Sequence, residues 1–332
     1  MRRFVAVLST AAVLGIGGAS VSQATFAGAE NGRIFYVVGA YTTYSTILSA
    51  CPANGGHVKT VVNLATWPMP SPDGTKIAYV KLKQVGNTAY NDGVWIANAD
   101  GSNAEQIAGS TYSPSAPAWS PDGTKLTFRR YVVYPAPNYS RMQPVVADIA
   151  TKVVTPLLTD GTITANTEQV TPNAWTADGS QIYFPAHPAS QSSDDLYRVP
   201  AGGGTATRIM GTDDELPFFQ RIDIAPDNSA MLVAQQVSYY EADNVTFNPL
   251  SETRRVGLGG GSGPLIGSIR MSTGVGDEGF AYSPDGSRVV FLRSPGEKLM
   301  TAEAGGANAI ALGGLGGAYP AWSSYLDDCT DP

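Results

Sequence analysis

The chain has 332 residues, of which 43% are hydrophobic and only 15% are charged, so it can bury a sizeable core. Its formal net charge of −7 argues against a nucleic-acid-binding surface, which would need a basic stripe. The 37 glycines and 23 prolines favour many tight turns over long helices.

Residues 1–24 have the pattern of a secretory signal peptide. Two arginines precede the apolar run "FVAVLSTAAVLGIGG", and small residues follow in "SVSQATFAGA". We expect cleavage after Ala24 or Ala29, with an uncleaved membrane anchor as the alternative. No later stretch reaches the 18 apolar residues that a membrane-spanning helix needs. The sequence therefore predicts an exported protein, periplasmic or secreted, with no transmembrane segment after cleavage.

A turn motif recurs along the rest of the chain. "SPDGTKIAYV" (71–80) returns as "SPDGTKLTFRR" (120–130) and "SPDGSRVVFLR" (283–293), and "TADG" (176–179) and "APDN" (225–228) are weaker copies. Pro presets the second position of a type I turn, and Gly suits its last position. Repetition of this kind predicts repeated architecture rather than chemistry. The turn aspartates are Asp73, Asp122, Asp178, Asp227 and Asp285.

Strand patterns flank each of these turns. Apolar residues stand four and six positions after each turn aspartate, which is the period of a strand with one buried face. A second hairpin follows around a Gly-rich turn such as "NADG" (98–101) or "AGGG" (201–204), although "DIAT" (148–151) is a weaker match. Four short antiparallel strands in each unit are typical of a propeller blade. Three residues before the turn aspartates stand Pro70, Trp119, Trp175, Ile224 and Tyr282.

The two ends of the chain complete one another. Ile34 in "ENGRIFYVV" matches Ile77, so the chain begins with a second strand that lacks a first. Trp322 in "YPAWSSYLDDC" matches Trp119, so the chain ends with a first strand that lacks a second. With the five internal units, this split unit predicts an all-β, six-bladed propeller over residues 30–326. The C-terminal strand closes the ring against N-terminal strands.

Cys51 and Cys329 are the only cysteines. Cys51 is near the second hairpin turn of the split blade, and Cys329 lies in the tail 327–332, at the same end of that sheet. We predict a disulfide that links the two ends of the ring, which an exported protein can keep. Two unpaired, partly buried thiols are the alternative.

Four stretches, "PAWSPDG" (117–123), "AYSPDG" (281–286), "NAWTADG" (173–179) and "PAWSS" (320–324), resemble the TolB-type, WD40-like β-propeller repeat. The resemblance covers essentially all of the expected mature chain. It implies the propeller part of that family, without the α/β domain that precedes the propeller in TolB itself. In function it implies binding of a protein partner.

Motifs of catalysis and metal binding are sparse. The sequence has no nucleophile elbow, H-E-x-x-H or phosphate-binding loop. Of the two histidines, we interpret His57 as a turn residue. His187 lies near acidic residues that could help it hold a divalent cation or act as a base, but we favour a solvated loop. We therefore expect no cofactor and favour a protein that is not an enzyme. The weak metal candidates are His187, Asp194, Asp195, Asp213 and Asp214.

Unequal loop length is the strongest functional signal. The link between second and third strands is extended in the third blade (129–143) and in the fifth (235–255). Both segments are rich in Tyr and Arg, which are enriched at interface hot spots, and loops on a rigid scaffold often carry function. The alternative is that these tyrosines pack onto neighbouring blades. The predicted partner-binding residues are Arg129, Arg130, Tyr131, Tyr134, Tyr239, Tyr240, Arg254 and Arg255.

From these observations we predict an exported, non-catalytic, monomeric propeller that serves as a protein-binding scaffold in the cell envelope or outside the cell. Because tyrosines also stack on sugar rings, a glycan-binding propeller is one alternative. A propeller lyase or hydrolase that uses rim carboxylates is another.

Overall fold

The structure is a computed structural model in which 25 β-strands and one short 3₁₀ turn are assigned. The expected signal peptide lies outside the described residues. Among those residues, no helix has the length and apolar character needed to cross a bilayer. The structure describes residues 30–40, 42, 44–112, 114–134, 139–158, 163–164, 173–188, 195–211, 218–240, 247–261, 265–270, 279–293, 298–327 and 329.

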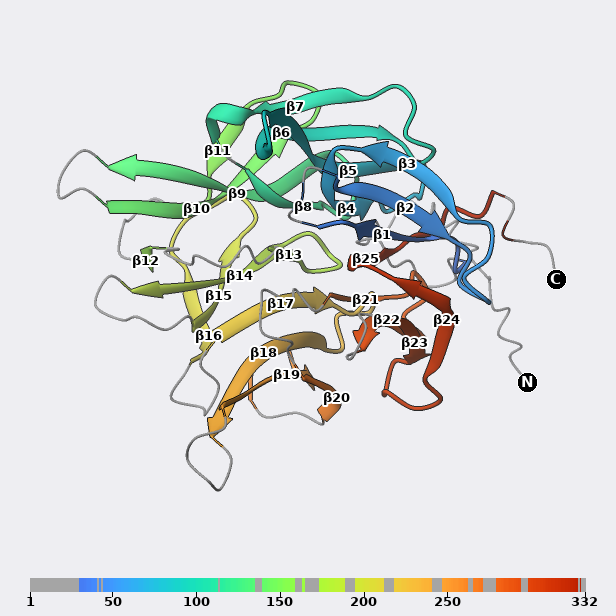
Figure 1. The fold of residues 1–332 in the computed structure, drawn as a ribbon. Helices are drawn as coiled ribbons and strands as arrows, with labels where there is room; N and C mark the ends of the chain where they lie inside the picture. The colour runs from blue at the N-terminus through green and yellow to red at the C-terminus, as the bar shows by residue number, and fades with distance from the viewer. Residues whose placement is uncertain are drawn as a thin grey trace, which may run out of the picture.

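Six antiparallel sheets stand around a central axis and form a six-bladed β-propeller (Figure 1), which confirms the predicted fold. Blade 1 contains β25 (Ala318–Trp322), β1 (Ile34–Val38), β2 (Thr46–Ala50) and β3 (Lys59–Asn63). Blade 2 contains β4 (Ala65–Pro70), β5 (Lys76–Val85), β6 (Thr88–Asn98) and β7 (Glu105–Gly109). Blade 3 contains β8 (Ser115–Trp119), β9 (Lys125–Tyr134), β10 (Tyr139–Asp148) and β11 (Val154–Pro156).

The remaining three blades complete the ring. Blade 4 contains β12 (Ile163–Thr164), β13 (Ala174–Trp175), β14 (Gln181–Pro188), β15 (Asp195–Pro200) and β16 (Thr207–Met210). Blade 5 contains β17 (Phe218–Ile224), β18 (Met231–Tyr240), β19 (Phe247–Val256) and β20 (Leu265–Arg270). Blade 6 contains β21 (Phe280–Tyr282), β22 (Arg288–Arg293), β23 (Lys298–Glu303) and β24 (Ile310–Gly316). Blade 4 departs from the four-strand pattern because β12 and β13 both pair with β14.

Each repeated turn is closed by its aspartate. In blade 3 the carboxylate of Asp122 accepts hydrogen bonds from Ser120 Oγ at 2.6 Å and from the Thr124 N–H at 3.0 Å. Burial alone would raise the pKa of Asp122, but these hydrogen bonds hold it below its usual range. Gly123 follows at φ +68°, a conformation that costs glycine little. The motif therefore fixes the turn between the first two strands of a blade.

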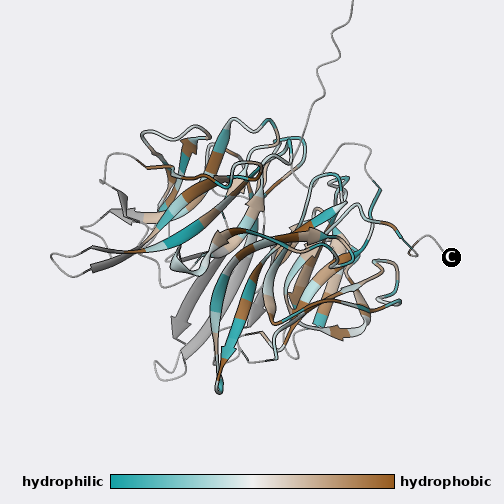
Figure 2. Cartoon of the chain, turned by 90° about the horizontal axis from the view of Figure 1, so that it is seen from above, coloured by the Kyte–Doolittle hydropathy of each residue, from teal (hydrophilic) through white to brown (hydrophobic). Residues whose placement is uncertain are grey.

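The cores lie between neighbouring blades. Figure 2 shows hydrophobic and hydrophilic residues alternating along the strands. One cluster joins Val94 of blade 2 to Trp119 and Phe128 of blade 3. The indole of Trp119 also donates to the Met69 carbonyl of blade 2 at 2.9 Å. The Trp119 indole thus both fills the space between blades 2 and 3 and ties blade 3 to the blade before it.

The ring closes in blade 1 as expected. β1 pairs with β25, and Ile34 lies opposite Trp322. Ser323 adds two backbone hydrogen bonds, accepting from Gly32 at 2.8 Å and donating to Arg33 at 3.0 Å. A disulfide joins Cys51 to Cys329 across 278 residues, with a Cα–Cα distance of 5.3 Å. The predicted pairing of the two cysteines is confirmed.

Candidate functional site

The extended links of blades 3 and 5 are long β-hairpins. β9 and β10 pair along their whole length until Tyr134 faces Tyr139, and β18 and β19 pair until Tyr240 faces Phe247. Both hairpins project on the side of the ring away from the chain ends (Figure 1), which we call the hairpin face. Continuous pairing makes these projections part of the rigid sheets.

Blade 2 carries a third long hairpin, which the sequence interpretation missed. β5 and β6 pair as far as Val85 and Thr88, and Gly86 takes φ +61° in the two-residue turn. Val85 and Tyr90 at this tip are 57% and 56% exposed, and Tyr131 on β9 of the adjacent blade is 44% exposed. The available signal was the Gly-Asn pair at positions 86 and 87, which is typical of a two-residue hairpin turn.

Arg129 does not face a partner, which corrects the expectation for this residue. Its side chain is fully buried. The guanidinium donates to the Pro185 carbonyl and, at 3.4 Å, to Asn173 Oδ1, and both acceptors belong to blade 4. Period-2 alternation turns Arg129 inward, between the blades. Arg129 is therefore an internal tie between blades 3 and 4.

The structure describes the side chains of Arg130, Arg254 and Arg255 among the other predicted partner-binding residues. Arg130 is half-buried and donates from Nε and Nη2 to Gln143 Oε1 at 2.9 and 2.7 Å. Arg255 is exposed but donates to Ser229 Oγ at 3.2 Å, beside the repeated turn, and half-buried Arg254 is its neighbour on β19. The arginine pair of blade 5 thus lies at the opposite end of its blade from the hairpin tip. Tyr134, Tyr239 and Tyr240 lie on the hairpin strands, and their side chains are outside the description.

Of the weak metal candidates, only the side chain of Asp195 is described. Asp195 is buried and forms an ion pair with Arg208 Nε at 2.7 Å, so it has a structural partner. His187 ends β14, and its side chain lies outside the description, as do Asp194, Asp213 and Asp214 altogether. His57 lies exposed in the β2–β3 turn. Within the described ranges, no three His, Cys, Asp or Glu side chains are grouped to hold a metal ion.

A central channel runs between the first strands of the blades. A cavity of about 40 Å³ in this channel is lined from all six blades. At the position four residues before the turn aspartate, blade 5 alone carries a charge, Asp223. The equivalent residues of the other blades are Met69, Ala118, Ala174, Ala281 and Ala321. Two residues earlier, where other blades carry Trp67, Ala116, Gly279 and Tyr319, blade 5 carries Arg221.

Arg221 and Asp223 are held by neighbouring inner strands. Arg221 Nη2 donates to the Pro320 carbonyl at 3.2 Å, and its guanidinium carbon lies 6.0 Å from the Phe280 ring centre. Asp223 Oδ2 accepts from the Tyr282 N–H at 2.7 Å. Burial lowers the pKa of Arg221 to about 10, against the opposing effect of Asp223. Burial also raises the pKa of Asp223 to about 6, although the Tyr282 N–H and Arg221 act to lower it.

Three residues with strained backbone conformations lie in the blades around Arg221 and Asp223. Trp67, Ala116 and Tyr319 each have a positive φ, from +40° to +57°, directly before a proline. The pairing register of their strands shifts at these positions. The Trp67 and Tyr319 rings approach to 3.8 Å between centres and, with Arg221, line a second, smaller cavity. Such strain is costly for residues other than glycine and concentrates at functional sites.

The sequence interpretation missed the channel residues. Their signal was the departure of blade 5 from its own repeats, which is visible once the positions before each turn are aligned. Chemically, the cavity offers one buried cation, one titratable carboxyl and the Asn173 amide among otherwise apolar lining residues. These groups can satisfy a polar or charged group of a ligand that enters the channel.

Comparisons with known proteins agree with this fold. A model of the TolB β-propeller domain matches residues 24–326. The Tol-Pal system protein TolB of Methylococcus capsulatus is 33% identical over 84 residues, which span 24% of this chain and 19% of the relative. The chain thus matches about a fifth of that relative's length.

Two solved structures show the same propeller. TolB from Acinetobacter baumannii superposes with a TM-score of 0.60 and 19% identity, covering 88% of this chain and 66% of that one. A putative TolB from Agrobacterium tumefaciens gives a TM-score of 0.55 and 16% identity, covering 80% of this chain and 90% of that one. At these identities the likeness concerns the fold, and the family match over residues 24–326 carries the assignment. The chain therefore belongs to the TolB β-propeller domain family.

Proposed function

We propose that this protein is an exported, non-catalytic TolB-like propeller that binds a protein partner on its hairpin face. The observation that carries the proposal is the exposure of Val85, Tyr90 and Tyr131 on the hairpins of two adjacent blades. Large apolar side chains on a rigid sheet provide contact area at little entropic cost, and tyrosine is enriched at interface hot spots. The match to the TolB β-propeller domain, and to a relative named as a protein of the Tol-Pal system, supports a protein-binding function here.

Export belongs to the proposal. The Cys51–Cys329 disulfide supports it because such bonds persist in oxidising compartments. The N-terminal pattern of residues 1–24 supports it independently. N-terminal sequencing of the protein recovered from the periplasm or medium should find a chain that begins after Ala24 or Ala29. A chain recovered only from the cytoplasm with an intact N-terminus would contradict export.

Site-specific crosslinking tests the partner. A photoreactive benzoylphenylalanine is placed at Tyr131 on the hairpin face. The same group at Val153, exposed in the β10–β11 turn at the other end of blade 3, is the matched control. Illumination of the producing cells should yield one discrete protein adduct at 131 and none at 153. The adduct protein is then purified, and its affinity for the native propeller is compared with its affinity for the Tyr90→Ala/Tyr131→Ala variant.

The outcomes separate the possible functions. A fall of at least tenfold in affinity for the double variant supports a protein partner on this face, because each truncated hot-spot residue typically costs more than 1 kcal/mol. Equal adducts at both positions, or an unchanged affinity, would contradict it. Retention of the propeller on cell-wall glycan, lost in the same variant, would favour a glycan ligand instead.

A further inference from the structure

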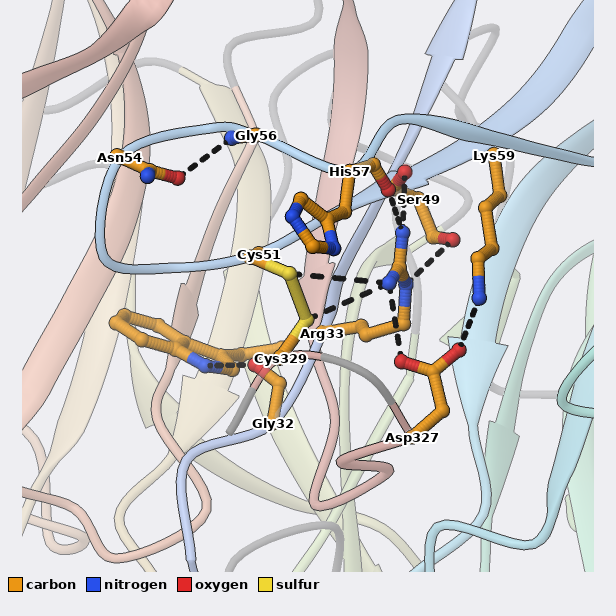
Figure 3. Close-up of a disulfide and its surroundings, with 11 residues drawn as sticks. Gly32, Arg33, Ser49, Cys51, Asn54, Gly56, His57, Lys59, Asp327 and Cys329 are labelled. Atoms are coloured by element: carbon orange, nitrogen blue, oxygen red, sulfur yellow. Dashed lines mark hydrogen bonds and ion pairs between the residues drawn. A yellow bond between two sulfur atoms is a disulfide. The ribbon is translucent and has the colours of Figure 1, made fainter. Parts of the chain in front are cut away.

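Arg33 lies against the disulfide that closes the ring (Figure 3). Its Nη1 approaches Cys329 Sγ at 3.4 Å and Cys51 Sγ at 3.8 Å. The same nitrogen forms an ion pair with Asp327 Oδ1 at 3.0 Å. The other guanidinium nitrogens are fixed by Ser49, whose Oγ and carbonyl accept at 2.9 and 3.1 Å, and by the His57 carbonyl. The guanidinium therefore has one orientation, with one edge directed at both sulfur atoms.

The charge of Arg33 is held away from water. The residue has no solvent-accessible surface, and Cys51 is only 6% exposed, whereas Cys329 is partly exposed. Lys59 lies on the solvent side of this cluster, where its ammonium contacts Asp327 Oδ2 at 2.7 Å. Asp327 is thus shared between two cations. A buried cation interacts strongly with any negative charge that forms beside it, because little solvent screens the pair.

A thiolate is such a charge. Cationic neighbours stabilise cysteine thiolates, and a thiol with a lower pKa is a better leaving group in thiol–disulfide exchange. We propose that Cys51–Cys329 is a thiol-exchange site in which Arg33 stabilises the departing thiolate. Its reactant is a small thiol or the dithiol of an oxidoreductase.

The exposure of the two cysteines sets the order of the reaction. The incoming thiolate attacks Sγ of Cys329, the more exposed of the two cysteines, and forms a mixed disulfide with it. The Cys51–Cys329 bond breaks, and its electron pair stays on Cys51 Sγ, 3.8 Å from Arg33 Nη1. A second reductant thiolate then attacks the reductant sulfur of the mixed disulfide and releases Cys329 as a thiolate. Two electrons reduce the protein, and the reductant leaves as its own disulfide.

Exchange at this site removes only the covalent part of the closure. The β1–β25 pairing, in which Ile34 faces Trp322, and the backbone hydrogen bonds of Ser323 do not involve the cysteines. The ring can therefore remain closed by hydrogen bonds while the tail that carries Cys329 is released. This separates reduction of the disulfide from unfolding of the propeller.

Reduction kinetics of the folded protein test the proposal. The oxidised chain is treated with dithiothreitol in native buffer, and free thiols are trapped by alkylation and counted by mass. Arg33→Gln removes the cation beside the sulfurs. Lys59→Gln removes an exposed cation that draws Asp327 away from Arg33. Lys152→Gln is the matched control, because Lys152 pairs with Glu105 at 2.6 Å between blades 2 and 3, whereas the disulfide belongs to blade 1.

We expect reduction to slow about tenfold in Arg33→Gln and two- to threefold in Lys59→Gln, with no change in Lys152→Gln. If Arg33 had a purely structural role, Arg33→Gln should instead be reduced faster, because loosening the contacts around the disulfide exposes it to the reductant. Reduction of Arg33→Gln at the native rate or faster would therefore overturn the proposal. If Arg33→Gln does not fold, as judged by circular dichroism, Lys59→Gln decides: slower reduction supports the proposal, and an equal or faster rate overturns it.

Discussion

Arg221 and Asp223 lie two residues apart on β17, and both face the central channel from the same blade. Period-2 alternation puts both side chains on one face of the strand. In the described part of the other blades, the residues at the positions equivalent to Asp223 and Arg221 are apolar. Blade 5 therefore places a buried cation and a half-buried carboxyl where the described residues of its sister blades carry neither.

Asp223 should make stability depend on pH between about 4 and 6. Its folded-state pKa of about 6 is above the ordinary aspartate value, so the folded protein binds this proton more tightly than the unfolded chain. The resulting stabilisation is complete below pH 4 and is lost as the pH rises through 6. A shift of this size corresponds to roughly 3 kcal/mol. Asp223→Asn removes the titration and keeps an acceptor for the Tyr282 N–H.

Urea unfolding of both proteins from pH 4 to pH 8 measures this effect. Subtracting the free energy of unfolding of Asp223→Asn from that of the native chain isolates the contribution of Asp223 to the pH dependence. The repeated-turn aspartates have lowered pKa values, so they titrate below this window in the folded state. The difference should fall between pH 4 and 6 and stay constant above 7. A difference that is flat over the whole range would show that the folded protein does not raise the pKa of Asp223.

Arg129 should contribute to stability rather than to binding. Arg129→Met leaves the Pro185 carbonyl and the Asn173 amide without their guanidinium partner, which should lower the free energy of unfolding by about 2–4 kcal/mol. Arg130→Met is the matched control on the next residue, where a half-buried bond to Gln143 should cost less than about 1 kcal/mol. Chemical denaturation gives both values. Equal effects of the two substitutions would contradict the internal role of Arg129.

The sequence predicted the fold well because the fold depends on local, repeated signals. Turn residues, alternating apolar positions and the incomplete units at the two ends are all visible without a structure, and they led to six blades and to the Cys51–Cys329 pair. The position of Arg129 between two blades was not predictable in this way. Its partners Asn173 and Pro185 lie in another blade and more than 40 residues away in sequence.

The channel residues and the extent of the hairpins were not predictable from the sequence, for two different reasons. Asp223 looks ordinary within its own strand and becomes unusual only beside Ala118 and Ala281, the equivalent residues of other blades. The sequence alone places Arg255 beside the hairpin tips, because residues 235–255 read as one long loop. In the structure it pairs with Leu232 near the base of β18, so strand extension separates it from Tyr240.

The disulfide should account for a large part of the stability of the ring. It closes a loop of 278 residues, for which the chain-entropy estimate is on the order of 5 kcal/mol. Cys51→Ser/Cys329→Ser should therefore unfold at a markedly lower urea concentration than the oxidised protein. Its circular dichroism in native buffer should still show the β-sheet spectrum, because the β1–β25 pairing remains. A double variant as stable as the native chain would mean that the ends are held without the covalent link.

The two irregular turns of blades 4 and 5 compensate for one another. Ala177 stands where blade 3 has Pro121, so blade 4 gains a backbone N–H that proline lacks. Asn228 of blade 5 stands where other turns have Gly, at φ +57°, and its Oδ1 accepts from the Ala177 N–H at 2.7 Å. What looked like two weakened copies of a motif is one hydrogen bond between adjacent blades.

A double-mutant cycle tests this coupling. Asn228→Gly alone should lower the free energy of unfolding by about 1–2 kcal/mol, because it removes the acceptor for the partly buried Ala177 N–H. Ala177→Pro alone should also destabilise the protein, because it removes the donor for Asn228. The two substitutions together restore a Pro–Gly pair like Pro226 and Gly286, where the proline lies so close that the glycine has no room for a side chain. The double variant should therefore be more stable than the sum of the two single effects predicts. Gly123→Asn is the control for the cost of asparagine in this backbone conformation, because Gly123 has open space around it. Strict additivity of the two single effects in urea unfolding would show that the two turns act independently.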